Sequence, residues 1–200
     1  IDTAHFTPQP APPERPFRVL MIARLLYMKG FEVALAAHAL LRKEGLDIEL
    51  VICGGPDEDN PSAIPPSVVD GWAKQTGVRF LGQVSDVRGE IAKAHVLIHP
   101  ALGGEGLPRV LMEASACERP LIASDVAGNS DIVVDGENGL LVKPGDPRAL
   151  ADAIAWMMRH PEERAGMGVK GRARVLEKFA SHHVAESYSG LYREIMNATR

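Results

Sequence analysis

Short apolar runs alternate with segments of helical periodicity along most of this 200-residue chain. Runs that are typical of strands lie at 17–23, 47–53, 78–81, 96–99, 120–124 and 139–142. Strands this short and this continuously apolar are usually buried on both faces of a parallel sheet. The pattern therefore predicts an α/β fold, with a doubly wound, Rossmann-like parallel sheet of about six strands.

The two ends of the chain differ from this central region. Residues 1–16 contain five prolines and predict a stiff, extended linker. Residues 17–160 make up the predicted sheet domain. Residues 161–200 continue a run of consecutive helices with no strand between them. We expect this helical C-terminal tail to pack on the edge of the sheet or to reach back to another domain.

Composition excludes several classes of protein. A formal net charge of -4 and a pI near 6.0 argue against nucleic acid or an anionic membrane surface as a general partner. No apolar run reaches the roughly 18 residues that a membrane span requires. Two isolated cysteines, Cys53 and Cys117, fit a reducing cytoplasm, and no Cys/His cluster suggests a metal site. Histidines in helical or linker contexts, including His38, are expected to face solvent.

A glycine-rich loop, 103–108, follows the strand at 96–99 and leads into a helix. The first amides of a helix lack intrahelical partners and attract anions, and the glycines of the loop let a ligand approach the backbone. Glu105 lies at the mouth of this helix and Glu113 lies within it. These carboxylates could accept hydroxyl groups of a sugar and a ribose, or could be a capping residue and a solvated surface residue.

Other candidates follow the first two strands. Arg24 and Lys29 could hold a diphosphate and stabilise its charge as a leaving group, although such residues are often ordinary surface charges. Gly54 and Gly55 could admit a ligand or could form only a turn. The first loop lacks the G-x-G-x-x-G turn of dinucleotide enzymes, which counts against NAD. Because parallel strands end at one edge, we expect the loops after strands one, two, four and five to face one crevice.

Taken in order, several motifs resemble the C-terminal domain of the group 1 (family 4) GT-B glycosyltransferases over essentially the whole chain. The matching segments are 2–6, Arg24-Leu25 with Lys29-Gly30, Gly54-Gly55-Pro56, Phe80-Leu81-Gly82, 105–108 with Glu113-Ala114, and 135–147. The chain departs from many relatives at Leu107-Pro108, where they have Phe-Gly, and at 128–131, where they have Gly-Ile-Pro-Glu. These departures bear on the identity of the donor.

The resemblance implies a retaining, metal-independent hexosyltransferase without a cofactor, in which a nucleotide-sugar donor, UDP- or GDP-linked, is the co-substrate. Its E-x7-E motif maps onto Glu105 and Glu113, which would contact the donor sugar and the ribose. Arg24 and Lys29 would bind the diphosphate. The remaining donor-binding positions that the resemblance implies are Gly54, Gly55, Val84 in the loop near the base, Gly104, Gly106, Leu107 and Pro108.

The same resemblance implies an N-terminal domain that would hold the acceptor site and lie against the tail helices. A peripheral membrane association would then depend on that domain, and the present chain alone would bind donor weakly and transfer nothing. A saccharide, a lipid-linked saccharide and a small molecule all stay open as acceptors. Two alternatives also stay open, namely a sugar-nucleotide epimerase of the same architecture and a non-catalytic sugar-nucleotide-binding module.

Overall fold

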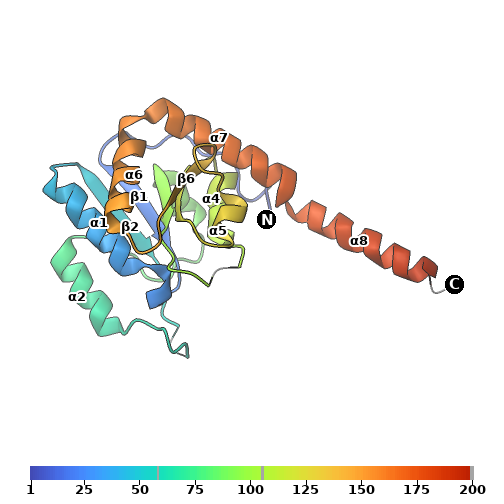
Figure 1. Ribbon diagram of the computed structural model, residues 1–200, viewed down its shortest axis with the longest axis horizontal. Coiled ribbons are helices and arrows are strands. Elements are labelled where there is room, and N and C mark those ends of the chain that lie inside the picture. The colour runs from blue at the N-terminus through green and yellow to red at the C-terminus, as the bar shows by residue number, and fades with distance from the viewer. Residues whose placement is uncertain (58, 105, 199–200) are drawn as a thin grey trace.

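The computed structural model describes residues 1–57, 59–104 and 106–198 (Figure 1). Its strands are β1 (Phe17–Ile22), β2 (Ile48–Cys53), β3 (Arg79–Phe80), β4 (Val96–His99), β5 (Leu121–Ser124) and β6 (Gly139–Val142). Its helices are η1 (Tyr27–Lys29, a 3-10 turn), α1 (Phe31–Lys43), α2 (Pro66–Thr76), α3 (Arg88–Lys93), α4 (Arg109–Ala116), α5 (Asn129–Ile132), α6 (Pro147–Arg159), α7 (Pro161–Lys178) and α8 (Ser181–Ala198).

The six strands form one sheet in the order β3-β2-β1-β4-β5-β6, and all neighbouring strands are parallel. This order confirms the predicted doubly wound, Rossmann-like sheet. In β1 the consecutive residues Val19, Leu20 and Met21 are each at most 1 % exposed. Such a run has no polar face because helices cover both sides of the strand.

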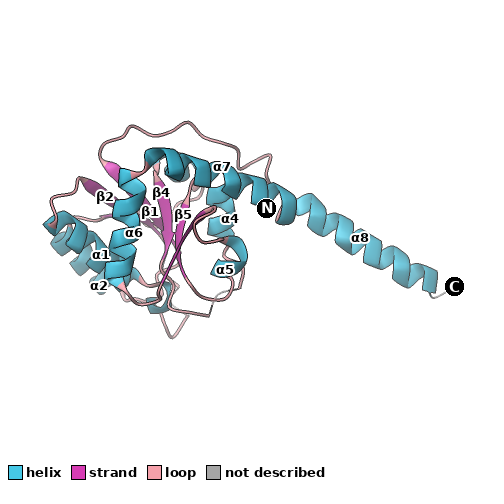
Figure 2. Ribbon diagram, turned by 45° about the horizontal axis from the view of Figure 1, so that its top comes forward, coloured by secondary structure: helices cyan, strands magenta, loops and turns pink. Residues whose placement is uncertain are grey.

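Helices cover both faces of the sheet (Figure 2), and an apolar layer lies on each face. One layer lies between the sheet and α1, α2 and α6, with Phe31, Leu41 and Ile154 among its buried side chains. The other layer includes Ile91 of α3 and Leu111 of α4. The crossover connections thus lie on both faces, and the loops after the strands meet at the carboxyl edge of the sheet.

The proline-rich segment 1–16 lies along the body of the protein, and arginine side chains of the body bind its carbonyl groups. Arg119, which is 5 % exposed, donates hydrogen bonds to the carbonyl oxygens of Gln9 at 3.1 Å and Pro10 at 2.6 Å. Arg172 donates to the carbonyl oxygen of Phe6 at 3.1 Å. The prolines at 8, 10, 12 and 13 have no backbone N–H group with which to pair in a sheet. Hydrogen bonds from arginine side chains hold this extended segment in place instead.

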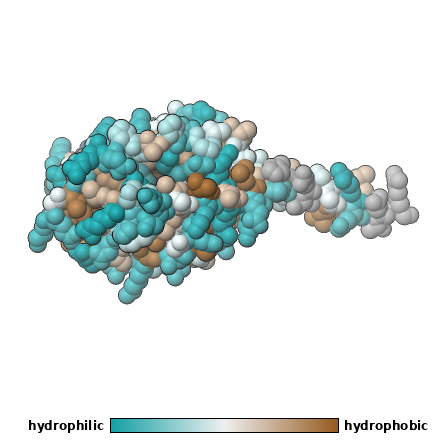
Figure 3. Space-filling model, turned by 90° about the horizontal axis from the view of Figure 1, so that it is seen from above, coloured by the Kyte–Doolittle hydropathy of each residue, from teal (hydrophilic) through white to brown (hydrophobic). Residues whose placement is uncertain are grey.

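The C-terminal helices take two different positions. Helix α6 packs on α1, and α7 packs on α4, α6 and β6. Helix α8 extends away from the body in Figures 1, 2 and 3. Its exposed apolar side chains recur at helical spacing and are Tyr188, Leu191, Tyr192, Ile195 and Met196. No helix in the described part of the chain is long and apolar enough to cross a membrane.

Two local expectations are corrected. Residues 129–132, which follow β5 and read as loop from the sequence, form the one-turn helix α5, with buried Asn129 donating to the carbonyl oxygen of Ser124 at 2.9 Å. His38 was expected to face solvent, but only 5 % of it is exposed. It lies on the inner face of α1 between Ala34 and Leu41, which are also buried, so the helical register places it in the core.

Burial of His38 predicts a pH-dependent stability. Desolvation lowers the pKa of His38 below its ordinary value, although an interaction with the backbone of Ile48 acts in the opposite direction. The unfolded chain therefore binds the proton more readily, and stability falls as the pH drops through the unfolded pKa of about 6.5. Urea unfolding between pH 7.5 and 5.5 should lose up to about 1.4 kcal/mol per pH unit through this group. His38→Gln should reduce the slope without abolishing it, because burial also lowers the pKa of His95, and an unchanged slope would contradict this account.

Candidate functional site

A cavity of about 310 Å³ opens at the carboxyl ends of β1 and β2. Three loops form it, after β1, after β2 and between β3 and α3. The residues that line it are Ile22, Ala23, Arg24, Cys53, Gly54, Gly55, Pro56, Gln83, Val84 and Val87. The structure thus places Arg24, Gly54, Gly55 and Val84 around one cavity.

Backbone hydrogen bonds join the three loops. The amide of Ala23 donates to the carbonyl of Cys53 at 3.0 Å, and the amide of Gly54 donates to the carbonyl of Gly82 at 2.8 Å. A Cβ atom at Gly54 would lie 2.0 Å from the carbonyl oxygen of Ala23. Position 54 must therefore be glycine for the first two loops to approach this closely.

The cavity has a cationic side and a neutral side. Arg24, after β1, is 63 % exposed at its side chain and pairs with Asp57, whose Oδ2 lies 2.5 Å from its Nη1. Across β2, the loop between β3 and α3 contributes Val84, Val87 and the amide side chain of Gln83. The Arg24 side could bind an anionic group of a ligand, and the valines offer apolar surface on the other side.

Sequence reasoning did not single out Asp57 or Gln83. Both lie directly beside predicted residues, Asp57 after the Gly54-Gly55-Pro56 turn and Gln83 before Val84. Gln83 packs against the second glycine of that turn, because a Cβ atom at Gly55 would lie 3.1 Å from its Oε1. Each residue follows the end of a predicted parallel strand, and this position in the sequence could have identified it as a candidate.

The glycine-rich loop after β4 lies against the turn after β1. The amide of Leu102 donates to the carbonyl of Met28 at 2.8 Å, and a Cβ atom at Gly104 would lie 2.7 Å from the Met28 side chain. Lys29 is the next residue of that turn and is partly exposed. The loop containing Gly104 is therefore adjacent to the segment that carries both predicted cations.

The other predicted residues of this region do not line the cavity. Lys29, Gly104, Gly106, Leu107, Pro108 and Glu113 are absent from its described lining, and Glu105 lies outside the described residues. Leu107 is 51 % exposed, and Pro108 is the N-cap of α4. The described loops after β4 and β5 contribute no lining residue to this cavity, so the single crevice expected from the sequence stays a prediction.

Glu113 lies in the middle of α4, and its side chain is only 14 % exposed. Burial raises the pKa of this carboxyl, and Arg109, whose Nη2 lies 3.4 Å from Oε1, partly offsets the shift. The carboxylate of Glu113 makes one ion pair, at 3.4 Å, and its oxygens can accept hydrogen bonds from further donors. Hydroxyl groups are donors of this kind.

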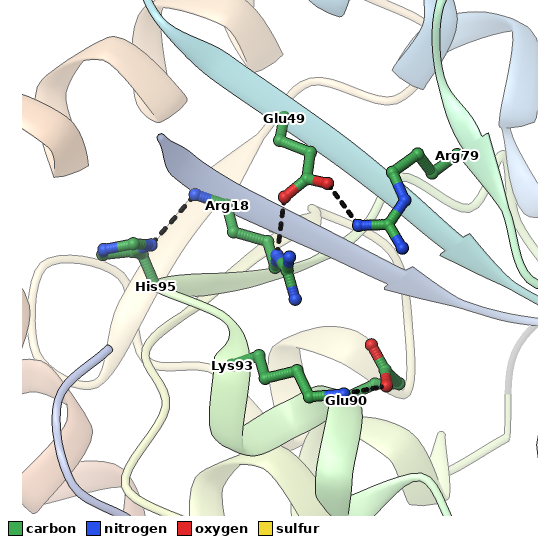
Figure 4. A network of polar contacts seen from close by, with 6 residues as sticks. All are labelled: Arg18, Glu49, Arg79, Glu90, Lys93 and His95. Atoms are coloured by element: carbon green, nitrogen blue, oxygen red, sulfur yellow. Dashed lines mark hydrogen bonds and ion pairs between the residues drawn. The ribbon is translucent and has the colours of Figure 1, made fainter. Parts of the chain in front are cut away.

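A second cavity, of about 400 Å³, lies at the opposite, amino edge of the sheet beneath the 10–16 segment. Charged residues near it are already paired (Figure 4). Glu49 accepts from Arg18 at 2.7 Å and from Arg79 at 2.6 Å, and Lys93 pairs with Glu90 at 2.6 Å. This network neutralises a part of the sheet face. At the smaller cavity of the carboxyl edge Arg24 is also ion-paired, but its guanidinium is 63 % exposed and the cavity is lined by glycine backbone.

The described residues contain no group of three His, Cys, Asp or Glu side chains that could hold a metal ion. Metal independence and the absence of a cofactor stay predictions of the sequence. Both cysteines are buried, and burial raises the pKa of each thiol to about 11. Neither is therefore a reactive thiolate near neutral pH.

The fold is that of one half of a GT-B glycosyltransferase. Sucrose-phosphate synthase from Thermosynechococcus elongatus superposes with a TM-score of 0.86 at 29 % identity, over 99 % of this chain and 51 % of that one. Anabaena Alr3699/HepE, solved in complex with UDP-glucose, superposes with a TM-score of 0.80 at 20 % identity, over 95 % of this chain and 56 % of that one.

Residues 2–174 match the family described as "Glycosyl transferases group 1", and the chain belongs to this family. The alpha-maltose-1-phosphate synthase of Mycolicibacterium smegmatis is 32 % identical over an aligned length of 189 residues, and the match covers 88 % of this chain and 48 % of that protein. The chain thus spans about half the length of the relatives it matches. This coverage is consistent with a C-terminal domain.

Proposed function

We propose that the chain is the donor-binding half of a retaining, metal-independent glycosyltransferase. It would bind a UDP- or GDP-linked hexose and pass the sugar to a saccharide or lipid-linked acceptor held by an N-terminal half. The observation that carries the proposal is the cavity at the carboxyl edge, where Arg24 lies opposite Val84 across Gly54 and Gly55. UDP-glucose bound by a protein of the same fold supports the choice of ligand class.

In this proposal each part of the site has a distinct task. The guanidinium of Arg24 and the ammonium of Lys29 bind the diphosphate and stabilise the charge that grows on it as the glycosidic bond breaks. The backbone of Gly54 and Gly55 allows close approach, and Val84 packs against the base. Glu105 and the backbone amides around Gly106 and Leu107 serve the donor sugar or its phosphate, with Gly104 and Pro108 in the same donor-binding loop, and Glu113 accepts the ribose hydroxyls.

The N-terminal half would join the chain before segment 1–16 and would cover the apolar side chains of α8. Five large apolar residues of α8 are between 51 % and 67 % exposed, which suits a helix that packs on another domain. A cytoplasmic location and peripheral membrane association through the missing half belong to the same proposal. By itself, the present chain should bind donor nucleotide weakly and transfer no sugar.

The complete protein tests this function directly. Incubated with UDP- or GDP-sugars and saccharide acceptors, it should release nucleoside diphosphate in step with a glycosylated product of retained anomeric configuration. Chelation of divalent metal should leave the rate unchanged. Interconversion of the sugar at the donor without transfer would show an epimerase instead, and binding without either reaction would show a non-catalytic module.

Glu113→Gln separates binding from stability. The substitution removes a charge that burial disfavours, so the free energy of unfolding at pH 7 should not fall. Loss of a charged acceptor should nevertheless weaken nucleoside diphosphate binding about tenfold or more, as calorimetry would measure. Glu90→Gln is the matched control, because Glu90 is a 16 % exposed, ion-paired glutamate that has no role in the proposed donor site. Equal affinities for Glu113→Gln and wild type would contradict the assignment.

A further inference from the structure

The cationic group at the mouth of the cavity already has an anionic partner within the chain. Arg24 Nη1 lies 2.5 Å from Asp57 Oδ2, and the two side chains come from the loops after β1 and β2. Asp57 directly follows Pro56, which lines the cavity together with Arg24. The ion pair therefore lies at the rim where an anionic ligand would enter.

The contact leaves part of the guanidinium available. Arginine carries five N–H donors, and the bond to Asp57 engages one terminal nitrogen. The Asp57 carboxylate nonetheless offsets the positive charge that would attract a phosphate, and it repels an anion bound beside it. A diphosphate must either share Arg24 with Asp57 or displace the carboxylate.

We propose that Asp57 sets the affinity of this site for a diphosphate by competing for Arg24. The inference rests on the proposed function, because it takes a diphosphate as the ligand of Arg24. With Asp57 present, the guanidinium has a second partner to which it returns when the anion leaves. The carboxylate thereby lowers the affinity for the nucleoside diphosphate that remains after sugar transfer, and it speeds the release of that product.

Calorimetric titration of the chain with inorganic pyrophosphate, UDP and GDP tests this inference. Asp57→Asn keeps the shape of the side chain but removes its charge, and should bind the diphosphates about two- to fivefold more tightly. The gain should shrink as salt is added, because the carboxylate is partly exposed. Asp57→Ala removes the carboxylate without introducing the amide of asparagine. It should change affinity in the same direction, which would exclude an effect of the asparagine amide itself.

Two further variants show whether the effect passes through Arg24. In an Arg24→Gln background, Asp57→Asn should give no gain, because there is no guanidinium to compete for. Asp59→Asn removes the same charge from an exposed position of the same loop and should stay close to wild type. A variant that misfolds would bind diphosphates more weakly. Tighter binding therefore cannot result from misfolding.

The outcomes separate this inference from the proposed function. If the wild-type chain binds diphosphates and Asp57→Asn binds them equally or more weakly, the inference is wrong and the proposed function stands. If the gain persists in the Arg24→Gln background, Asp57 acts through its general field rather than through competition, and the inference is again wrong. If the wild type binds neither pyrophosphate nor any nucleotide, both fail.

Discussion

Replacing Arg24 by alanine in the complete protein is expected to lower the rate of sugar transfer about 100- to 1000-fold. In the proposed function the guanidinium stabilises the negative charge that grows on the departing diphosphate, so the loss should appear mainly in kcat. Stability should change by less than about 1 kcal/mol, because an exposed ion pair with Asp57 contributes little to folding. Initial-rate kinetics with a fixed acceptor measure the effect.

Arg159→Ala is the charge-matched control for this experiment. Arg159 is an exposed residue at the end of α6 and lies outside the lining of the cavity. Its replacement should leave kcat and KM close to wild type. A small effect of Arg24→Ala, no larger than that of the control, would show that the diphosphate binds elsewhere.

Gly30→Ala should be the most destabilising of the conservative substitutions near the site. Gly30 joins η1 to α1 with φ of 77°, and a Cβ atom there would lie 1.9 Å from the carbonyl oxygen of Pro100. The carbonyl belongs to the backbone and cannot rotate away as a side chain would. We expect a loss of roughly 3 kcal/mol or more, from left-handed strain combined with overpacking. Urea unfolding of the purified variant measures the loss.

Gly45→Ala isolates the two contributions. Gly45 has φ of 79°, almost the same as Gly30, but nothing lies within 4 Å of the position of its Cβ atom. Only the left-handed strain applies there, so the cost should be about 1 kcal/mol. If Gly30→Ala and Gly45→Ala cost the same, then contact between the loops after β1 and β4 does not constrain position 30.

The sheet was predictable because its strands carry a strong local signal. The strand containing Val19, Leu20 and Met21 is buried on both faces, and this burial appears directly in the sequence as an unbroken apolar run. The helical period indicated the buried position of His38, which shares a face of α1 with Ala34 and Leu41, but the polar imidazole favoured an exposed position. The short helix α5 was missed because four residues are too few to show a helical period.

The residues of the candidate site that belong to recognisable sequence motifs could be predicted. Arg24, Gly54 and Val84 follow adjacent strands, and parallel topology brings the ends of those strands together. The partnership of Arg24 with Asp57 depends on the path of the loop after β2, which propensity and spacing do not determine. Contact between Gly104 and Met28 depends likewise on how two irregular loops pack.

An NMR titration of the chain with UDP, GDP and ADP tests the central claim most directly. We predict saturable shifts of backbone amides at residues 22–24, 53–55 and 83–87 with at least one nucleotide, and their loss in Arg24→Ala. Absence of binding to any of the three would contradict the claim. Shifts confined to the amino-edge cavity, at residues 11, 15, 18, 49 and 92–95, would contradict it equally.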